Sequence, residues 1–364
     1  MLIYIFLFLS VALFSYLEMT HNEITLLGHK YNTRKVAIIY LGLLFLFIGV
    51  MRHDLLGPDS HNYHDYFNLW VDTLSWEYLF THFLLDNGYY AFNKFVRLFV
   101  QDFWVFKSIL YIITFTIYYY VIIKNSKNVS LSLLVFLGIE RLIGIFCLLR
   151  QEVAIAICFY SIKYIKEKKL IPFIICILIA LTFHKTSIFF VLAYIFVNHV
   201  DDELHFTIKW KGNLKEINFT KYTGLFLLSI LSIVLLPIMI YLYPIDYTNG
   251  IVFGQGTFKL CVIIFNILLA NCILILGNKF SDKGKLLYDI TFCSLVPQIV
   301  TLCFPVFTRV TSYFYIFLCL LIPELLGNKM KYNKYLLLYC CTVFGFLFFY
   351  SIQGNIVPYV FKFF

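Results

Sequence analysis

The stretch FWVFKSILYIITFTIYYYVII, residues 103–123, decides the class of fold. It is apolar and long enough for a helix to cross the hydrocarbon core of a bilayer, which takes about 20 residues. Comparable apolar runs lie near residues 2–17, 36–51, 129–147, 150–165, 170–183, 186–199, 222–243, 258–277, 287–304, 310–327 and 335–351. We therefore expect residues 1–364 to form a single all-α transmembrane domain, a polytopic helical bundle of about twelve spans.

The composition supports a membrane protein. Of the 364 residues, 61% are hydrophobic and only 13% are charged, whereas a soluble domain of this length exposes far more charge. The net charge of +9 raises the question of nucleic acid, but no hydrophilic segment is long enough to form a basic soluble face. The charge instead fits the excess of basic residues in the cytoplasmic loops of membrane proteins.

The cysteines and the first apolar run add little chemistry. All ten cysteines fall inside apolar stretches, without a CxxC pair or a histidine or carboxylate at the spacing of metal ligands, so we expect buried packing residues and neither a metal nor a cofactor. The run beginning at Leu2 has no basic segment before it and no small-residue cleavage site, which predicts a retained span.

The loops set the orientation. With the amino terminus outside, 19 of the 29 lysines and arginines fall in short loops facing the cytoplasm, and the opposite orientation puts all of these outside. Of the six arginines only Arg34 lies in such a loop, and the others lie in outer segments or at outer ends of spans. Because arginine suits bidentate phosphate recognition, this asymmetry indicates an anionic ligand on the outer face.

The longest segment between spans, residues 52–102, is predicted to be an outer, periplasmic loop. Apolar residues recur at helical spacing at Phe92, Phe95, Val96 and Phe99, which predicts an amphipathic helix lying at the membrane interface. The segment is also rich in aspartate and aromatic residues. Two interpretations stay open: an aromatic belt that anchors a loop, or a platform for sugars.

Ionisable residues at the edge of a bilayer core are costly, so each is a candidate functional residue. The second span ends in Arg52, followed by Gly57-Pro58-Asp59 and Tyr63. Arg52 is either an interfacial cation or a ligand-binding residue. Asp59 is either a turn residue or a catalytic carboxylate.

Three further outer corners carry such residues. Between the fourth and fifth spans lie Glu140-Arg141 and Arg150-Gln151, where local ion pairs are the alternative to a ligand site. The hairpin between the sixth and seventh spans holds His184, either a hydrogen-bonded turn residue or a proton-transfer group. Arg309, followed by Tyr313, is either an interfacial anchor or part of a site. One topology puts all these corners at one depth, which favours a shared cavity.

In this order the motifs resemble a known family. RHDLLGPDSHNYHDYF (52–67), LRQEVAIAICFYSIKYIKEKK (149–169), LTFHKTSIFFVLAYIF (181–196) and RVTSYFYIFLCLLIPEL (309–325) are similar to the EpsG-like branch of the Wzy-type O-antigen and capsular polysaccharide polymerases. The resemblance covers roughly residues 40–325. The positions that match the family's motifs are Arg52, Gly57, Asp59, Tyr63, Arg150, Gln151, His184 and Arg309.

The resemblance implies a GT-C-like glycosyltransferase of the bacterial inner membrane, acting in O-antigen, lipopolysaccharide or capsule synthesis. Such an enzyme transfers a glycan from undecaprenyl diphosphate to the non-reducing end of a lipid-linked repeat unit on the periplasmic face. A polysaccharide chain-length regulator is the protein partner that the family implies, beside the lipid bilayer.

The chemistry of the residues agrees with this reaction. A diphosphate leaving group needs cations, and the acceptor hydroxyl needs a base. The outer face has no DxD-like metal pair, so we expect metal-independent catalysis in which Arg150 and Arg309 hold the diphosphate and His184 or Asp59 is the base. Arg52, Gln151, Tyr63, Arg141 and Tyr313 are the expected substrate-binding residues.

Three rival functions remain. An O-antigen ligase has a large outer loop late in the chain, whereas here the late loop, residues 244–257, is short. A flippase or other transporter of lipid-linked oligosaccharide places charges near the middle of the bilayer, whereas these gather at the outer mouth. A membrane-bound acyltransferase would also use a histidine base.

Overall fold

The computed structural model describes residues 1–26, 28–81, 86–201, 203–210, 213–220, 281–301, 307–326, 333–356 and 358–362. The chain divides into two compact units. The first comprises Met1–Tyr164, Ile171–Ile188 and Ile316–Phe364, and the second comprises Ile165–Leu170 and Phe189–Tyr315. Each unit is described by itself below.

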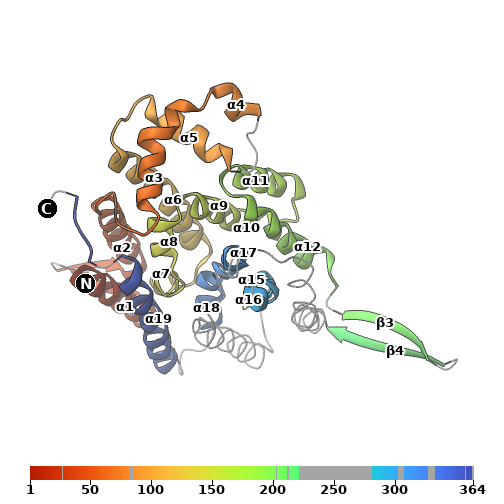
Figure 1. The fold of residues 1–364 in the computed structure, drawn as a ribbon. Coiled ribbons are helices and arrows are strands. Elements are labelled where there is room, and N and C mark those ends of the chain that lie inside the picture. The colour runs from red at the N-terminus through yellow and green to blue at the C-terminus, as the bar shows by residue number, and fades with distance from the viewer. Residues whose placement is uncertain are drawn as a thin grey trace. The chain divides into compact units, whose positions relative to one another are not determined.

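The described part of the chain is mostly helical (Figure 1). Its first half contains α1 (Leu2–Thr20), α2 (Thr33–Val50), α3 (Ser60–Asp65), the π-helix η1 (Tyr66–Trp70), the 3-10 helix η2 (Val71–Thr73), α4 (Trp76–Thr81), α5 (Asn87–Arg97), α6 (Phe103–Asn125), α7 (Val129–Gly138), α8 (Arg141–Cys147), α9 (Leu149–Tyr160), α10 (Ile162–Lys166) and α11 (Leu170–Phe183). The second half contains the 3-10 helix η3 (Lys185–Phe190), α12 (Val191–His199), α15 (Asp282–Phe292), α16 (Leu295–Thr301), α17 (Thr308–Tyr315), α18 (Leu318–Leu326) and α19 (Asn333–Asn355).

Several of these helices suit a membrane by length and composition. In the described ranges four pass that test: α1, α2, α6 and the run Thr308–Leu326. Helices α7 and α8 together make a fifth, bent by 59° at Ile139 and Glu140. The chain is therefore a helical membrane protein, in agreement with the apolar runs of its sequence.

In the described residues the predicted spans fall on helical segments, but the helices long enough to cross a membrane number four, or five with the bent pair α7 and α8, so the total of about twelve spans stays a prediction. The run 170–183 coincides with α11, whereas 129–147 is broken between α7 and α8 and 287–304 between α15 and α16. The predicted spans 222–243 and 258–277 lie outside the described residues. Two antiparallel hairpins were not predicted: β1 (Glu23–Leu26) with β2 (His29–Asn32), and β3 (Glu203–Trp210) with β4 (Asn213–Thr220).

Helix α7 is the centre of the first unit. All of its residues are buried, and it packs against α1, α2, α18 and α19 (Figure 1). Aromatic pairs join the neighbouring helices, for example the stacked rings of Phe45 on α2 and Phe115 on α6 at 5.3 Å. Without water around them, helices of this kind are held by such close packing.

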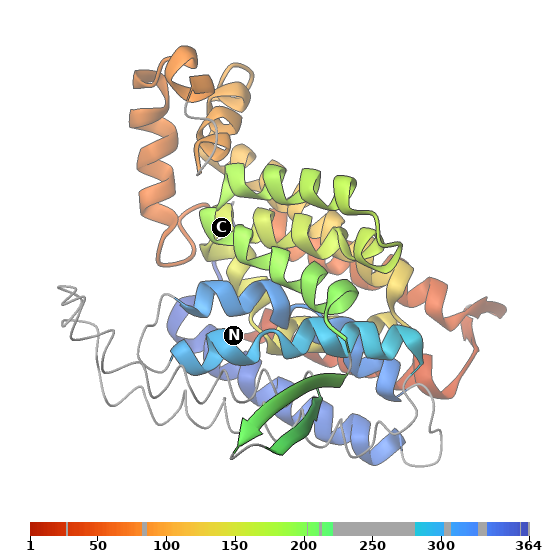
Figure 2. The same ribbon diagram turned by 90° about the vertical axis from the view of Figure 1, so that its right-hand side faces the viewer.

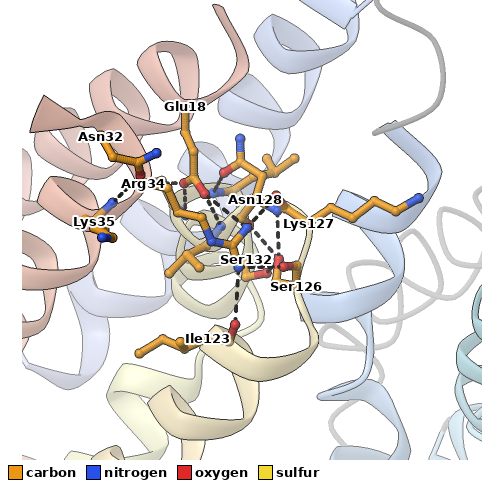
Figure 3. Close-up of polar contacts among 12 residues, drawn as sticks. Glu18, Asn32, Arg34, Lys35, Ile123, Ser126, Lys127, Asn128 and Ser132 are labelled. Carbon is orange, nitrogen blue, oxygen red and sulfur yellow. Dashed lines mark hydrogen bonds and ion pairs between the residues drawn. The ribbon is translucent and has the colours of Figure 1, made fainter. Parts of the chain in front are cut away.

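A polar cluster ties the ends of four helices at one end of the first unit (Figure 3). The Glu18 carboxylate accepts hydrogen bonds from the Val129 and Ser130 amides at 3.0 Å, so it caps the start of α7. Arg34 at the start of α2 donates to the carbonyl oxygens of Ile123 and Ser126 at the end of α6 and lies 3.7 Å from Glu18. The loops 18–35 and 124–128, both predicted to face the cytoplasm, therefore meet.

The carboxyl-terminal segment forms a strap, residues 358–362, across the end of α2. The amide of His53 donates to the Val360 carbonyl at 2.8 Å, and the amide of Lys362 donates to the Met51 carbonyl at 3.0 Å. The Lys362 ammonium also binds the Asp54 carboxylate at 3.0 Å. The strap therefore fixes the segment that follows α2, where the outer polar residues begin.

Residues 60–81 and 86–97 contain α3, η1, η2, α4 and α5, drawn in orange in Figures 1 and 2. The predicted helix around Phe92 and Val96 is confirmed as α5. Its buried side joins Phe67 of η1 and Phe106 of α6 in one apolar cluster, which also includes Leu149 of α9. This cluster attaches the segment to α6 and α9.

Candidate functional site

Arg150 is the centre of the candidate site. It lies in the first turn of α9, and its Nη1 donates to the Tyr90 hydroxyl at 3.0 Å. The same nitrogen lies 3.9 Å from Oδ2 of Asp86, and the guanidinium carbon lies 5.7 Å and 5.9 Å from the ring centres of Tyr90 and Tyr89. The side chain is 30% exposed. Arg150 is thus held by its neighbours and still accessible to a ligand.

Tyrosines from three elements surround this arginine. The rings of Tyr66 on η1 and Tyr90 on α5 stack at 4.3 Å, and Tyr63 on α3 meets Tyr89 edge to face at 5.9 Å. Burial raises the pKa of the Tyr63 phenol, and the charge and hydrogen bond of Arg150 oppose that rise. Burial also raises the pKa of Tyr66. The Tyr63 and Tyr66 phenols are therefore neutral at physiological pH and act as hydrogen-bonding groups.

The hairpin after α11 adjoins the same site through Asp86. The Asp86 Oδ1 accepts the Lys185 amide at 2.9 Å, and the Asp86 amide donates to the Leu181 carbonyl at 3.3 Å. His184 itself is 6% exposed, and its Nδ1 shares a hydrogen bond of 2.7 Å with Thr186 Oγ1. The structure thus brings the hairpin of His184 to the carboxylate that faces Arg150.

Arg52 is buried rather than exposed, with 2% of its surface accessible. Its guanidinium carbon lies 4.2 Å from the ring centre of Phe146 and 5.2 Å from that of Tyr111, and Nη1 donates to the Gly49 carbonyl at 3.1 Å. Burial lowers the pKa of Arg52 to about 10, so the group is still cationic at neutral pH. In this arrangement Arg52 packs the end of α2 between aromatic rings.

Lys107 of α6 holds the loop after Arg52 through hydrogen bonds. Its buried ammonium donates to the Asp54 carbonyl at 2.6 Å and to the Ser60 hydroxyl at 3.0 Å. Gly57 in this loop has a φ of 111°, which favours glycine, and a Cβ there would lie 2.8 Å from Cys147 Sγ. The loop positions Asp59, which precedes α3, and Tyr63 one turn further on.

Arg141 and Gln151 are buried near the bend between α7 and α8. Arg141 Nη1 lies 2.8 Å from Oε1 of Glu152, and Tyr118 donates to Oε2 of the same carboxylate at 2.7 Å. Arg141 Nε also donates to the Ile139 carbonyl at the bend. Arg141 and Glu152 thus form an internal ion pair next to the bend. Gln151, the residue before Glu152, is buried as well.

Arg309 and Tyr313 belong to the second unit. Both lie on α17, where Arg309 is exposed and Tyr313 is buried. Their expected place beside Arg150 stays a prediction. Within the described ranges no cluster of histidine, cysteine or carboxylate side chains has the makings of a metal site.

Four residues of this region were not singled out as site residues by the sequence: Asp86, Tyr90, Lys107 and Glu152. Lys107 carried a usable signal, because it is the single charge inside the apolar run 103–123. Asp86 and Tyr90 carried none, since the segment 52–102 contains several aspartates and tyrosines and no spacing selects these two.

The fold and the site define the class: a helical membrane protein with a cationic, tyrosine-lined site at one end of its helices. The model of the EpsG family matches residues 37–361, so the chain belongs to the EpsG family. The predicted resemblance to this family is confirmed. Membership points to a polymerase-like glycosyltransferase role in membrane polysaccharide synthesis. Neither a curated protein nor a solved structure matches the chain.

Proposed function

We propose that the chain is a polysaccharide polymerase of the bacterial inner membrane. It transfers a glycan from undecaprenyl diphosphate to the non-reducing end of a lipid-linked repeat unit on the periplasmic face, for an O-antigen or a capsule. The observation that carries the proposal is Arg150, a partly exposed guanidinium framed by Tyr63, Tyr90 and Asp86 in a chain of the EpsG family.

This site fits the electrostatic demand of the reaction. Breaking the bond between the sugar and the diphosphate leaves negative charge on a phosphate oxygen, and a preorganised cation stabilises that charge as it develops. Arg150 has a planar fork of donors suited to phosphate, and the phenols of Tyr63 and Tyr90 offer hydrogen bonds to phosphate or sugar oxygens. We further propose that Arg309 binds the same diphosphate, that Tyr313 and Gln151 support substrate binding, and that no metal takes part. Arg141 supports binding indirectly, because its pair with Glu152 holds the bend between α7 and α8.

The proposed architecture is a GT-C-like bundle of about twelve spans with the amino terminus outside. The meeting of the lysine-bearing loops 18–35 and 124–128 at one end of the first unit supports this orientation. An even number of spans brings the last residues of the chain to the side of the membrane where α2 ends. The contact of the strap 358–362 with Asp54, just after α2, agrees with this. A chain-length regulator is the proposed partner.

Deleting the gene and examining the surface polysaccharide tests the proposal. A polymerase mutant displays single repeat units in place of long chains. Loss of all surface sugar would instead indicate a flippase, and polymer left on its lipid carrier would indicate a ligase. Either of the last two results refutes the proposal.

Variants of Arg150 in the deletion strain test the site. Arg150→Ala and Arg150→Lys should both shorten the polymer, because lysine keeps the charge but loses the fork. One charge-assisted hydrogen bond contributes about 1.5–3 kcal/mol, which corresponds to a rate loss of about 10- to 150-fold. Arg97→Lys is the matched control, since Arg97 binds Asn68 and Gln101 of the outer segment. Unchanged polymer length and yield with both Arg150→Ala and Arg309→Ala would rule out the assigned roles.

A further inference from the structure

Asp86 has an unusual position in the first unit. Its φ is 81°, the left-handed conformation, in which aspartate and asparagine are tolerated better than other residues with a side chain. The residue lies just before α5 and is fixed on both sides, by its amide bond to Leu181 and by the bond from the Lys185 amide to Oδ1. A left-handed non-glycine residue that is fixed by several contacts is typical of a functional site.

One carboxylate oxygen of Asp86 is directed toward Arg150. Oδ2 lies 3.9 Å from Arg150 Nη1, while Oδ1 is engaged by the Lys185 amide, and the side chain is 20% exposed. The distance is longer than that of a charge-assisted hydrogen bond. The carboxylate and the guanidinium thus face each other at the accessible part of the site.

The neighbouring candidates for a base are placed less favourably. The His184 ring is buried, and its Nδ1 is engaged by Thr186. Burial is the main cause that raises the pKa of the Tyr63 phenol, and the negative charge of Asp59 adds to it, so Asp59 acts on Tyr63. In the described contacts the carboxylate paired with Arg150 is that of Asp86. Only Asp86, among these three, has an accessible carboxylate fixed opposite Arg150.

We propose that Asp86 is the base that activates the acceptor hydroxyl, a role that rests on the proposed polymerase function. The O–H bond of the acceptor sugar breaks and its proton moves to the Asp86 carboxylate. The freed electron pair forms the new bond to the anomeric carbon of the donor. The bond from that carbon to the diphosphate oxygen breaks, and its electron pair leaves with the diphosphate beside Arg150. The protonated carboxyl then returns its proton to water.

Because the backbone at Asp86 is left-handed, asparagine and glycine are the substitutions that change its side chain without straining the backbone. Asp86→Asn keeps an oxygen that accepts the Lys185 amide and tolerates the conformation, but it cannot take up a proton. Asp86→Gly removes the side chain at a φ that glycine adopts freely. Asp65→Asn is the matched control, because Asp65 lies on the same outer segment, is exposed and pairs only with His64 in the described contacts.

The experiment measures polymer synthesis by the full-length protein in proteoliposomes supplied with lipid-linked repeat units. We expect Asp86→Asn and Asp86→Gly to lower kcat by about 100-fold or more while KM changes by less than about threefold. We expect the wild-type rate to fall at acidic pH. This fall should be absent from the residual activity of Asp86→Asn. Asp65→Asn should keep both the wild-type rate and the wild-type pH profile.

Two results would overturn the role of Asp86. One is an Asp86→Asn protein that keeps most of the rate with its acidic limb intact. The other is a loss that appears in KM or in the melting temperature instead of kcat, as expected if Asp86 only holds the hairpin. A wild-type protein that makes no polymer under these conditions refutes the proposed function, and the inference with it, whereas active wild-type and active Asp86→Asn proteins refute the inference alone.

Discussion

Replacing Glu152 by alanine should strongly destabilise the first unit. The Glu152 carboxylate is completely buried and binds Arg141 at 2.8 Å and the Tyr118 hydroxyl at 2.7 Å. Without it, the Arg141 guanidinium is left as a buried charge that has lost its carboxylate, and the Tyr118 hydroxyl loses its shorter hydrogen bond while the one to the Glu152 backbone carbonyl at 3.2 Å remains. Removing one partner of a buried ion pair costs about 3–5 kcal/mol.

The double variant separates the pair from the packing around it. Arg141→Met removes the cation and should cost a similar amount, because the carboxylate then stays buried without its counter-ion. Arg141→Met combined with Glu152→Gln removes both charges while the Tyr118 hydroxyl keeps an oxygen to donate to. We expect this protein to be more stable than the Arg141→Met protein by about 2 kcal/mol or more.

The assay is the free energy of unfolding of purified protein in detergent, obtained from a denaturant titration of wild type, Glu152→Ala, Arg141→Met, Glu152→Gln and the double variant, so that the last three complete a double-mutant cycle with wild type. Gly144→Ala is a useful comparison, since its Cβ would lie 2.2 Å from Glu152 Oε1 and displace the same carboxylate without changing any charge. If the effects of the single changes add without coupling, or if Glu152→Ala costs less than about 1 kcal/mol, then Arg141 and Glu152 do not act as a pair.

Three further outcomes follow from other contacts. Gly88→Ala puts a Cβ 2.4 Å from Thr182, so it should separate α5 from the last turn of α11, destabilise the protein by about 1–3 kcal/mol and lower polymer yield in the deletion strain. Glu18→Gln weakens the cap at the start of α7 and should lower the free energy of unfolding by about 0.5–2 kcal/mol, which a detergent-based titration measures. Burial alone would raise the pKa of Asp54, but the hydrogen bond and charge of Lys362 outweigh it and lower that pKa. The strap contact is therefore fully present above the ordinary carboxyl pKa of about 3.9 and is lost as the pH falls through the lower folded-state value. Amide exchange in residues 359–362, corrected for intrinsic rates, should accelerate only in that acidic range, and in Asp54→Asn it should be fast throughout.

The sequence predicted the helices better than it predicted their breaks. Apolar length alone marked 170–183 and 103–123 correctly, because a bilayer requires long uncharged helices. The bend inside 129–147 depends on Glu140, whose φ of 65° is left-handed, and on Arg141, whose Nε donates to the carbonyl of Ile139. Hydropathy is uniform through this run, so only the two charges marked the break.

The candidate site was predictable at its centre and not at its edges. Arg150 stood out as a cation at the mouth of a span, and the hairpin of His184 stood out for the same reason. Their connection through Asp86 depends on the packing of α5 against α11, where Gly88 allows a close approach to Thr182. Contacts between residues about one hundred positions apart leave no mark in local spacing.

The preference for arginine on the outer side now has two separate explanations. Arg52 packs between Tyr111 and Phe146, Arg141 pairs with Glu152, and Arg97 binds Asn68, so these three stabilise the first unit itself. Buried or half-buried sites of this kind favour arginine over lysine, because its weakly hydrated planar group stacks on rings and bonds in several directions. Arg150 is 30% exposed and Arg309 is exposed, whereas the half-buried Arg97 is engaged by Asn68 and Gln101. The excess of arginine in segments predicted to lie outside therefore mainly reflects packing, and exposure together with the contacts of each guanidinium distinguishes the cations available to an anionic substrate from those that hold the fold.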